Sequence, residues 1–116
     1  MGLILHQKES GLIAELQSDT VLAETQDFLD LMANAGYSGA EKMIIHKHNL
    51  PEDFFRLETR LAGEVLQKFS TYNQKLAIIG DFSVYNSKSL HDFIRESNRS
   101  RRIIFVSTVD EALSVL

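Results

Sequence analysis

The sequence predicts a single α/β domain over residues 1–116, with a mostly parallel β-sheet, an N-terminal β-hairpin and the element order ββαβαβαβα. Three observations carry this prediction. Continuous apolar runs alternate along the chain with segments of helical periodicity, as in parallel strands joined by crossover helices. Two short apolar runs separated by a polar turn come before them. No repeat, linker or low-complexity tract divides the chain.

The first elements are a hairpin and a helix. Leu3–Leu5 and Leu12–Ala14 are apolar runs separated by a polar turn, in which Gly11 is expected to take a positive φ. From about Gln26 the apolar residues follow helical spacing. Gly36 then stands where a helix commonly ends in a glycine.

Three later runs are expected to be buried parallel strands, because each is continuously apolar and β-branched. They are Met43–Ile45, Leu76–Ile79 and Ile103–Val106. Between the first two, Pro51 marks a helix start, and apolar residues at steps of three and four predict a helix reaching Phe69.

Two further helices are expected from their N-terminal capping residues. Ser89 precedes a helical face formed by Leu90, Phe93, Ile94 and Ser97. Thr108, with Glu111 three residues later, forms a capping box before the last helix.

Composition places the chain among ordinary globular proteins and excludes several functions. The net charge is −4 and there is no cysteine, so thiolate catalysis and cysteine-ligated metals are excluded. The acidic balance argues against nucleic-acid binding. No apolar run approaches the ~20 residues that cross a bilayer, and the start lacks the features of a signal peptide. We therefore expect a cytoplasmic protein that has no membrane contact.

Ligands of open α/β sheets usually bind beyond the carboxyl ends of the strands. That rule directs attention to the polar residues that follow the third, fourth and fifth strands: His46, His48, Asn49, Asp81, Ser83, Tyr85, Ser107 and Thr108. Among them, Asp81 is a candidate base or ion ligand. The alternative is that Asp81 accepts hydrogen bonds from the backbone of its own loop, a common role of aspartate in turns.

His46 and His48 have the i, i+2 spacing that places two side chains on one side of a strand. Such a pair is able to meet one metal ion, but a zinc site normally needs three or four protein ligands. No further ligand is identifiable from spacing, so we expect no metal and no cofactor.

Glu58 is a second unusual carboxylate. In a continuous helix it falls inside the apolar arc, where its carboxyl group needs a partner such as Arg56 or Arg60. A helix break near Leu57 instead makes Glu58 a first-turn acid facing water. Thr59, beside it, is a candidate N-cap or phospho-acceptor.

Four arginines form the densest basic cluster: Arg95, Arg99, Arg101 and Arg102. They suit either a phosphate or acidic partner, or a solvated helix C-terminus whose negative dipole favours cations. The familiar phosphate-binding, metalloprotease and nucleophile-elbow motifs are absent. Phosphorylation of Asp81 in the manner of a receiver domain is disfavoured, because Leu5-His6-Gln7 supplies no acid after the first strand.

Three segments carry a resemblance to a known family: residues 53–69, residues 76–83 and residues 87–98, whose middle part reads Leu90-His91-Asp92-Phe93-Ile94-Arg95. Together they resemble the bacterial family called domain of unknown function 4180, over nearly the whole chain. The resemblance implies no activity, substrate or catalytic residue.

The element order is also similar to that of STAS domains of the anti-sigma-factor-antagonist type. Those domains end in a segment like Ser107–Leu113, and their hallmark is a D-S-S-G-like turn whose serine is phosphorylated. The resemblance implies that Thr59 matches the phospho-acceptor and Glu58 the acid before it. The glycine and the paired serine of that turn are absent here.

Two functions follow as expectations. The first is a non-enzymatic regulatory or protein-interaction domain of STAS-like fold, controlled by phosphorylation or by a small ligand. Its binding or regulatory residues are expected among Glu58, Thr59, Arg60, Asp81, Ser83 and His46. The alternative is a small enzyme or ligand-binding protein whose polar site uses Asp81, Glu58 and His46. An uncovered edge strand in the hairpin also favours a homodimer.

Overall fold

The computed structural model describes residues 2–116 and contains one sheet with the strand order β1-β2-β3-β4-β5. The strands are β1 (Leu3–Lys8), β2 (Gly11–Leu16), β3 (Ala40–His46), β4 (Lys75–Ile79) and β5 (Ile103–Val106). β1 pairs with β2 in antiparallel orientation, and the other three pairings are parallel. The predicted α/β class, hairpin and mostly parallel sheet are confirmed.

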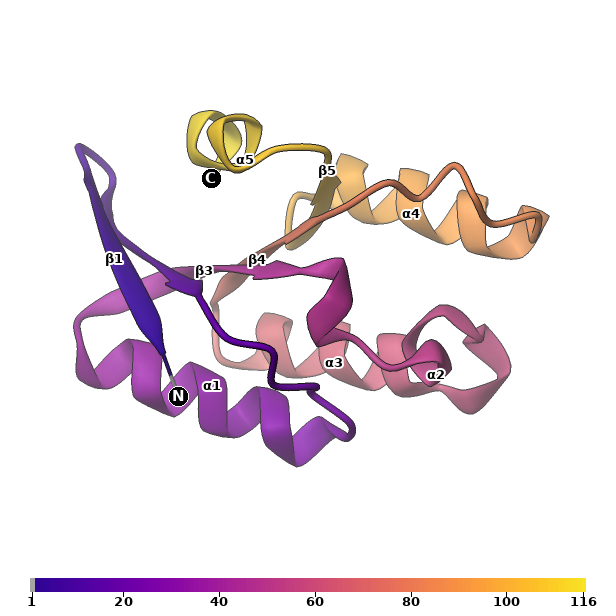
Figure 1. Ribbon diagram of the computed structural model, residues 1–116, viewed down its shortest axis with the longest axis horizontal. Coiled ribbons are helices and arrows are strands. Elements are labelled where there is room, and N and C mark those ends of the chain that lie inside the picture. The colour runs from indigo at the N-terminus through magenta and orange to yellow at the C-terminus, as the bar shows by residue number, and fades with distance from the viewer. Residues whose placement is uncertain (1) are drawn as a thin grey trace.

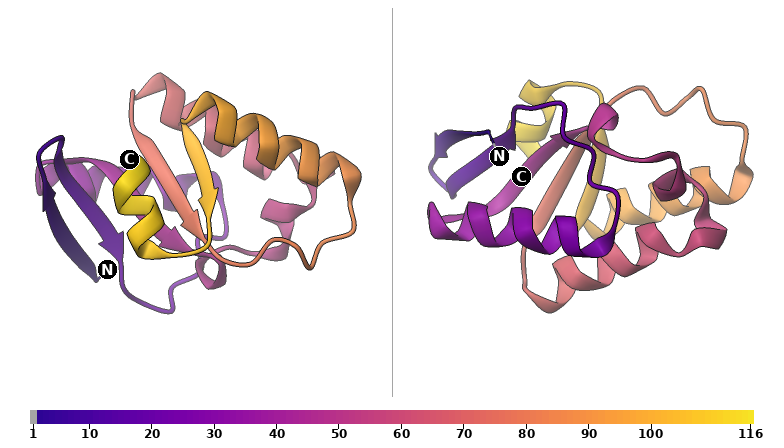
Figure 2. Two further views of the ribbon diagram at one scale, coloured as in Figure 1. Left: turned by 90° about the horizontal axis from the view of Figure 1, so that it is seen from above. Right: turned by 60° about the horizontal axis from the view of Figure 1, so that its bottom comes forward.

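The helices cover the two faces of this sheet unequally. They are α1 (Thr25–Tyr37), α2 (Glu52–Phe55), α3 (Leu61–Thr71), α4 (Lys88–Ser100) and α5 (Val109–Val115). Each parallel strand is added on the same side of the preceding one, so right-handed crossovers place their helices on one face. Figure 1 shows α1 and α3 below the sheet and α5 above it, and the second view of Figure 2 shows α1, α3 and α4 together on the lower side.

The core follows the period-2 alternation of the strands. On the crossover side, residues such as Met43, Ile78 and Phe105 meet the fully buried rings of Phe28 and Phe69. Each such side chain contributes roughly 1.5–3 kcal/mol by burial. On the other side a smaller core lies under α5: Ile13, Ile44, Ala77, Ile79, Ile104, Val106 and Ala112.

The prediction of a single helix between Pro51 and Phe69 is wrong. The chain forms α2, a 3₁₀ turn over Leu57–Thr59, and then α3. The Thr59 hydroxyl donates to the carbonyl oxygens of Asp53 (2.6 Å) and Arg56 (2.8 Å), and Arg60 takes a left-handed φ of 70°. Both features prevent one helix from running through this segment.

Two expected helix boundaries also move. Helix α1 continues past Gly36, and the positive φ of 92° falls on Gly39. Helix α4 is capped by Ser87, whose hydroxyl accepts from the Leu90 N–H at 3.1 Å, and not by Ser89. Thr108 caps α5 as predicted, accepting from the Glu111 N–H at 3.1 Å.

Candidate functional site

The carboxyl ends of β3 and β4 open into a pocket of about 550 Å³, here called the carboxyl-end pocket. Two loops form it, one running from β3 into α2 and the other leaving β4. Gly80 lets them approach, because a Cβ at this position would lie 2.7 Å from the Cβ of Lys47. The pocket is lined by His46, Lys47, His48, Leu50, Glu52, Phe55, Ile79, Gly80 and Tyr85.

An aromatic pair joins the two loops at the pocket. The rings of Phe55 and Tyr85 stack with centroids 4.8 Å apart. The Lys47 ammonium lies 4.8 Å from the centroid of Tyr85 and donates to the Asp81 carbonyl oxygen at 3.0 Å. Burial, and then the charge of Glu52, raise the pKa of Tyr85, so its hydroxyl remains protonated. The pocket thus offers flat apolar surface beside a cation.

The charges at the pocket are unevenly compensated. Glu52 pairs with Arg56 at 3.2 Å, one helical turn away. Within residues 2–116, Lys47 has no carboxylate within ion-pair distance. The Lys47 ammonium helps to lower the pKa of the nearby Asp81 carboxylate and lies beside Tyr85, where it is available to a ligand that carries a negative charge.

A buried carboxylate lies next to the pocket on the face of the sheet that carries α5. Glu15 of β2 is only 6% exposed. It accepts hydrogen bonds from the Nε2 atoms of His6 on β1 (2.9 Å) and His46 on β3 (2.8 Å). Burial raises the pKa of Glu15, but the hydrogen bonds from His46 and His6 outweigh it and hold the pKa below the usual range. Glu15 is therefore an ionised acceptor between two imidazoles.

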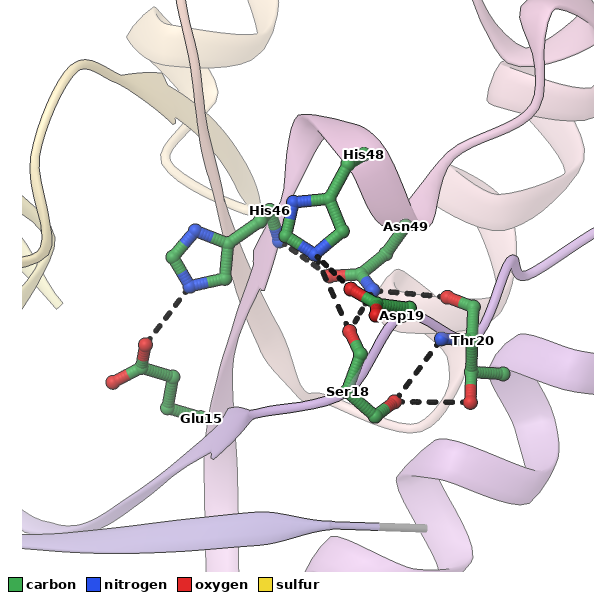
Figure 3. A network of polar contacts seen from close by, with 7 residues as sticks. All are labelled: Glu15, Ser18, Asp19, Thr20, His46, His48 and Asn49. Carbon is green, nitrogen blue, oxygen red and sulfur yellow. Dashed lines mark hydrogen bonds and ion pairs between the residues drawn. The ribbon is translucent and has the colours of Figure 1, made fainter.

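The loop after β3 is fixed by Asn49, which is fully buried. Its side-chain oxygen accepts from the His46 N–H, and its amide nitrogen donates to the carbonyl oxygens of Ser18 and Thr20, each at 2.9 Å. Figure 3 shows this clamp together with Glu15 and His46. Asn49 thereby ties the end of β3 to the loop that follows β2.

His46 and His48 do not lie on one side of a strand as their spacing suggested. β3 ends at His46, and His48 lies in the 3₁₀ turn Lys47–Asn49. Their rings stack with centroids 5.5 Å apart, while Nε2 of His46 is bonded to Glu15. Across residues 2–116, no group of three histidine, cysteine or acidic side chains is placed to hold a metal ion. No helix in the same range is long and apolar enough to cross a membrane.

Of the other predicted site residues, Asp81 and Ser83 lie in the loop that follows β4 and do not line the pocket. The exposed Asp81 carboxylate accepts from the Ser83 N–H (3.0 Å) and hydroxyl (2.6 Å). These two bonds lower the pKa of Asp81. Asp81 thus stabilises its own loop, and only its carbonyl oxygen contacts Lys47, which lines the pocket.

Glu58, Thr59 and Arg60 are all exposed in the connection between α2 and α3, and none lines the carboxyl-end pocket. The buried position considered for Glu58 is wrong, because the helix breaks before it. Of the polar residues singled out at the strand ends, His46, His48 and Tyr85 line the pocket itself. Sequence reasoning did not select Glu15, whose one signal was a lone charge in the apolar run Leu12–Leu16.

The arginine cluster lies at the end of α4 and beyond it. Arg95 pairs with Asp92, Arg99 pairs with Glu96 at 3.1 Å, and Arg102 donates to the Gln74 carbonyl oxygen at 3.1 Å. These contacts are those of a solvated helix end, and the cluster is separate from the carboxyl-end pocket.

Comparison with known proteins places the chain in a family. No curated protein and no solved structure matched it. The sequence profile of one family, described as Domain of unknown function (DUF4180), matches residues 8–116. Since this match spans nearly the whole chain, from the end of β1 to the residue after α5, the chain belongs to the DUF4180 family.

Proposed function

We propose that this domain is a regulatory module that binds a small, planar, negatively charged molecule in the carboxyl-end pocket. One observation carries the proposal: the stacked Phe55–Tyr85 pair and the Lys47 ammonium lie together at the strand ends. A flat ring packs against aromatic side chains, and an ammonium near a ring face is available to an anionic substituent.

The regulatory part of the proposal rests on how the pocket is built. Its walls come from two segments whose Phe55 and Tyr85 rings stack on each other, so a ligand that packs against this pair would change how α2 and the loop after β4 are held together. The sequential order of β2 to β5, with crossover helices on one face, supports the STAS-like assignment. That likeness is one of fold and adds support for a regulatory role only by analogy.

The experiment is an NMR titration of the ¹⁵N-labelled protein with benzoate, AMP and inorganic phosphate. We expect benzoate or AMP to give saturable shifts in the amides of Lys47–Phe55 and Gly80–Tyr85. Phosphate alone should give weaker binding, because it has no ring to pack on Tyr85. Saturable shifts confined to other segments, or none with either planar anion, would refute the proposed site.

Two variants separate the aromatic wall from general surface effects. Tyr85→Ala should weaken binding of the planar anion about tenfold, which corresponds to ~1.4 kcal/mol of binding free energy. Tyr37→Ala is the matched control, because Tyr37 is 96% exposed and lies outside the pocket. Equal effects of the two substitutions would contradict a role for Tyr85.

A second candidate function is phosphorylation of Thr59, favoured by its exposed position before α3. The Thr59 hydroxyl holds the carbonyl oxygens of Asp53 and Arg56, at the end of the helix that carries Phe55. Phosphorylation removes that donor and adds about two negative charges. It would therefore loosen α2 and alter the aromatic wall of the pocket.

Amide hydrogen exchange tests this switch. Thr59→Glu should increase the exchange rates of the Phe54, Phe55 and Arg56 amides about tenfold, as expected for the loss of ~1.4 kcal/mol of local stability. Thr59→Ser keeps the hydroxyl and should exchange like the unmodified protein. Unchanged exchange in Thr59→Glu would exclude a switch that acts through α2.

A further inference from the structure

The sheet places one carboxylate between two imidazoles from neighbouring strands. Glu15 faces the α5 side of β2, and His6 and His46 reach it from β1 and β3. The side chain of Glu15 is 8% exposed, whereas those of His6 and His46 are 26% and 25% exposed. The carboxylate is thus nearly buried, while each imidazole is partly exposed to solvent.

The hydrogen bonds fix which ring nitrogen of His46 is available. Because an ionised carboxylate only accepts, Nε2 of His46 must carry the proton that it donates to Glu15. In the neutral ring, Nδ1 is then an unprotonated acceptor. Within residues 2–116 no side chain donates to Nδ1 of His46, and His46 lines the carboxyl-end pocket.

We propose that Glu15 and His46 form an acid–base pair, in which Nδ1 of His46 takes a proton from a planar molecule bound in the carboxyl-end pocket. Glu15 is the positioning residue: it holds the ring, fixes the proton on Nε2 and stabilises the imidazolium formed when Nδ1 accepts a proton. The substrate class is a flat ring with an acidic C–H or O–H group. This inference rests on the proposed pocket.

The groups around His46 suit this chemistry. Glu15 contacts the ring on one side, and His48 stacks on it. His6 shares the same carboxylate from β1 but does not line the pocket. Lys47, the next residue along the chain, supplies the positive charge that stabilises an anion left by proton removal.

A suitable probe is 5-nitrobenzisoxazole, a flat ring that reacts by loss of one proton. His46 Nδ1 takes the proton on C3, the C–H electron pair forms the third C–N bond, and the N–O bond breaks to leave a phenolate. The imidazolium then returns its proton to water. No other reactant is needed, and the 2-cyano-4-nitrophenolate product is followed by its absorbance.

The expected results separate His46 from the other histidine bonded to Glu15. His46→Gln should lower kcat for the probe about 100-fold, the size of a general-base contribution. His6→Gln removes one hydrogen bond to Glu15 but leaves His46 and the pocket walls in place, so it should lower kcat less than about tenfold. Tyr37→Ala, which lies outside the pocket, is the control and should leave kcat unchanged. Added imidazole should raise the turnover of His46→Ala and should leave that of the unmodified protein unchanged.

Comparing kcat with KM distinguishes a positioning role of Glu15 from a role in the stability of the pocket alone. Glu15→Gln should lower kcat about tenfold while KM stays unchanged, since the pocket walls remain. If Glu15→Gln does not fold, the His46 variants still decide the proposal.

The outcomes distinguish this inference from the pocket on which it rests. Saturable NMR shifts by the probe without turnover, or equal loss of turnover in His6→Gln and His46→Gln, would overturn the acid–base pair and leave the binding site standing. Absence of both shifts and turnover with this uncharged probe would overturn the acid–base pair, and the titration with benzoate and AMP decides the anion-binding site separately.

Discussion

At the scale of single residues, Glu15 is a charge buried in an otherwise apolar strand. Removing a carboxylate from water is unfavourable unless partners satisfy it. Here His6 and His46 do so, and their hydrogen bonds hold the pKa of Glu15 below its ordinary value of 4.5. A group whose pKa is lowered on folding stabilises the folded state above its unfolded pKa, and loses that contribution as the pH falls through the folded pKa.

Glu15→Gln should therefore lower the free energy of unfolding by ~1.5–3 kcal/mol at pH 7, the usual range for hydrogen bonds to a charged group. The difference from the unmodified protein should shrink as the pH falls from the ordinary glutamate pKa of 4.5 through the lower pKa of the folded state, because the unfolded chain is protonated first. Urea denaturation at several pH values measures this. Glu41→Gln is the control, because Glu41 is exposed on β3. A constant difference across the pH range would contradict the role of Glu15.

The sequence located His46, because a polar residue after a buried strand is visible in the chain itself. It did not locate Glu15, since the two partners of Glu15 lie 9 and 31 residues away and meet it only when three strands align. Asn49 was visible after the third strand, but its clamp onto Ser18 and Thr20 depends on tertiary contacts. Residue type and spacing predict which element a side chain belongs to. They do not predict which groups, distant in the sequence, become its hydrogen-bond partners.

At the scale of elements, the strands were predictable and the helix connections less so. Continuous β-branched runs mark β3, β4 and β5, because both of their faces are buried. The segment after Pro51 keeps helical spacing from Phe54 to Phe69, yet it breaks at Arg60, whose φ is 70°. A positive φ on a residue other than glycine is uncommon and leaves no mark in the hydrophobic pattern. Phe55, at the end of the short helix before this break, stacks on Tyr85 at the pocket.

At the scale of the whole molecule, sequential strand addition leaves one face of the sheet to α5 alone. That helix has seven residues and packs mainly on β4 and β5. The rest of this face carries the polar group of His6, Glu15 and His46. At the far edge, β1 exposes Leu5 and leaves its outer side unpaired, so the homodimer expected from the hairpin stays a prediction.

The dependence of this face on α5 gives the last prediction. Ala112 is fully buried against the smaller core under α5, with Ile79 and Val106. Ala112→Asp places a carboxylate there with no partner, which should lower the free energy of unfolding by ~2–4 kcal/mol. Ser114→Asp, on the exposed side of the same helix, should change it by no more than ~0.5 kcal/mol.

Urea denaturation of the two aspartate variants measures the difference, and amide exchange locates it. Loss of protection in Val109–Val115 with β3 and β4 still protected would show that α5 detaches as a unit, because the larger core on the other face does not depend on it. Equal stabilities of Ala112→Asp and Ser114→Asp would mean that α5 does not cover the sheet in solution. The apolar side chains of β4 and β5 on that face would then need another cover.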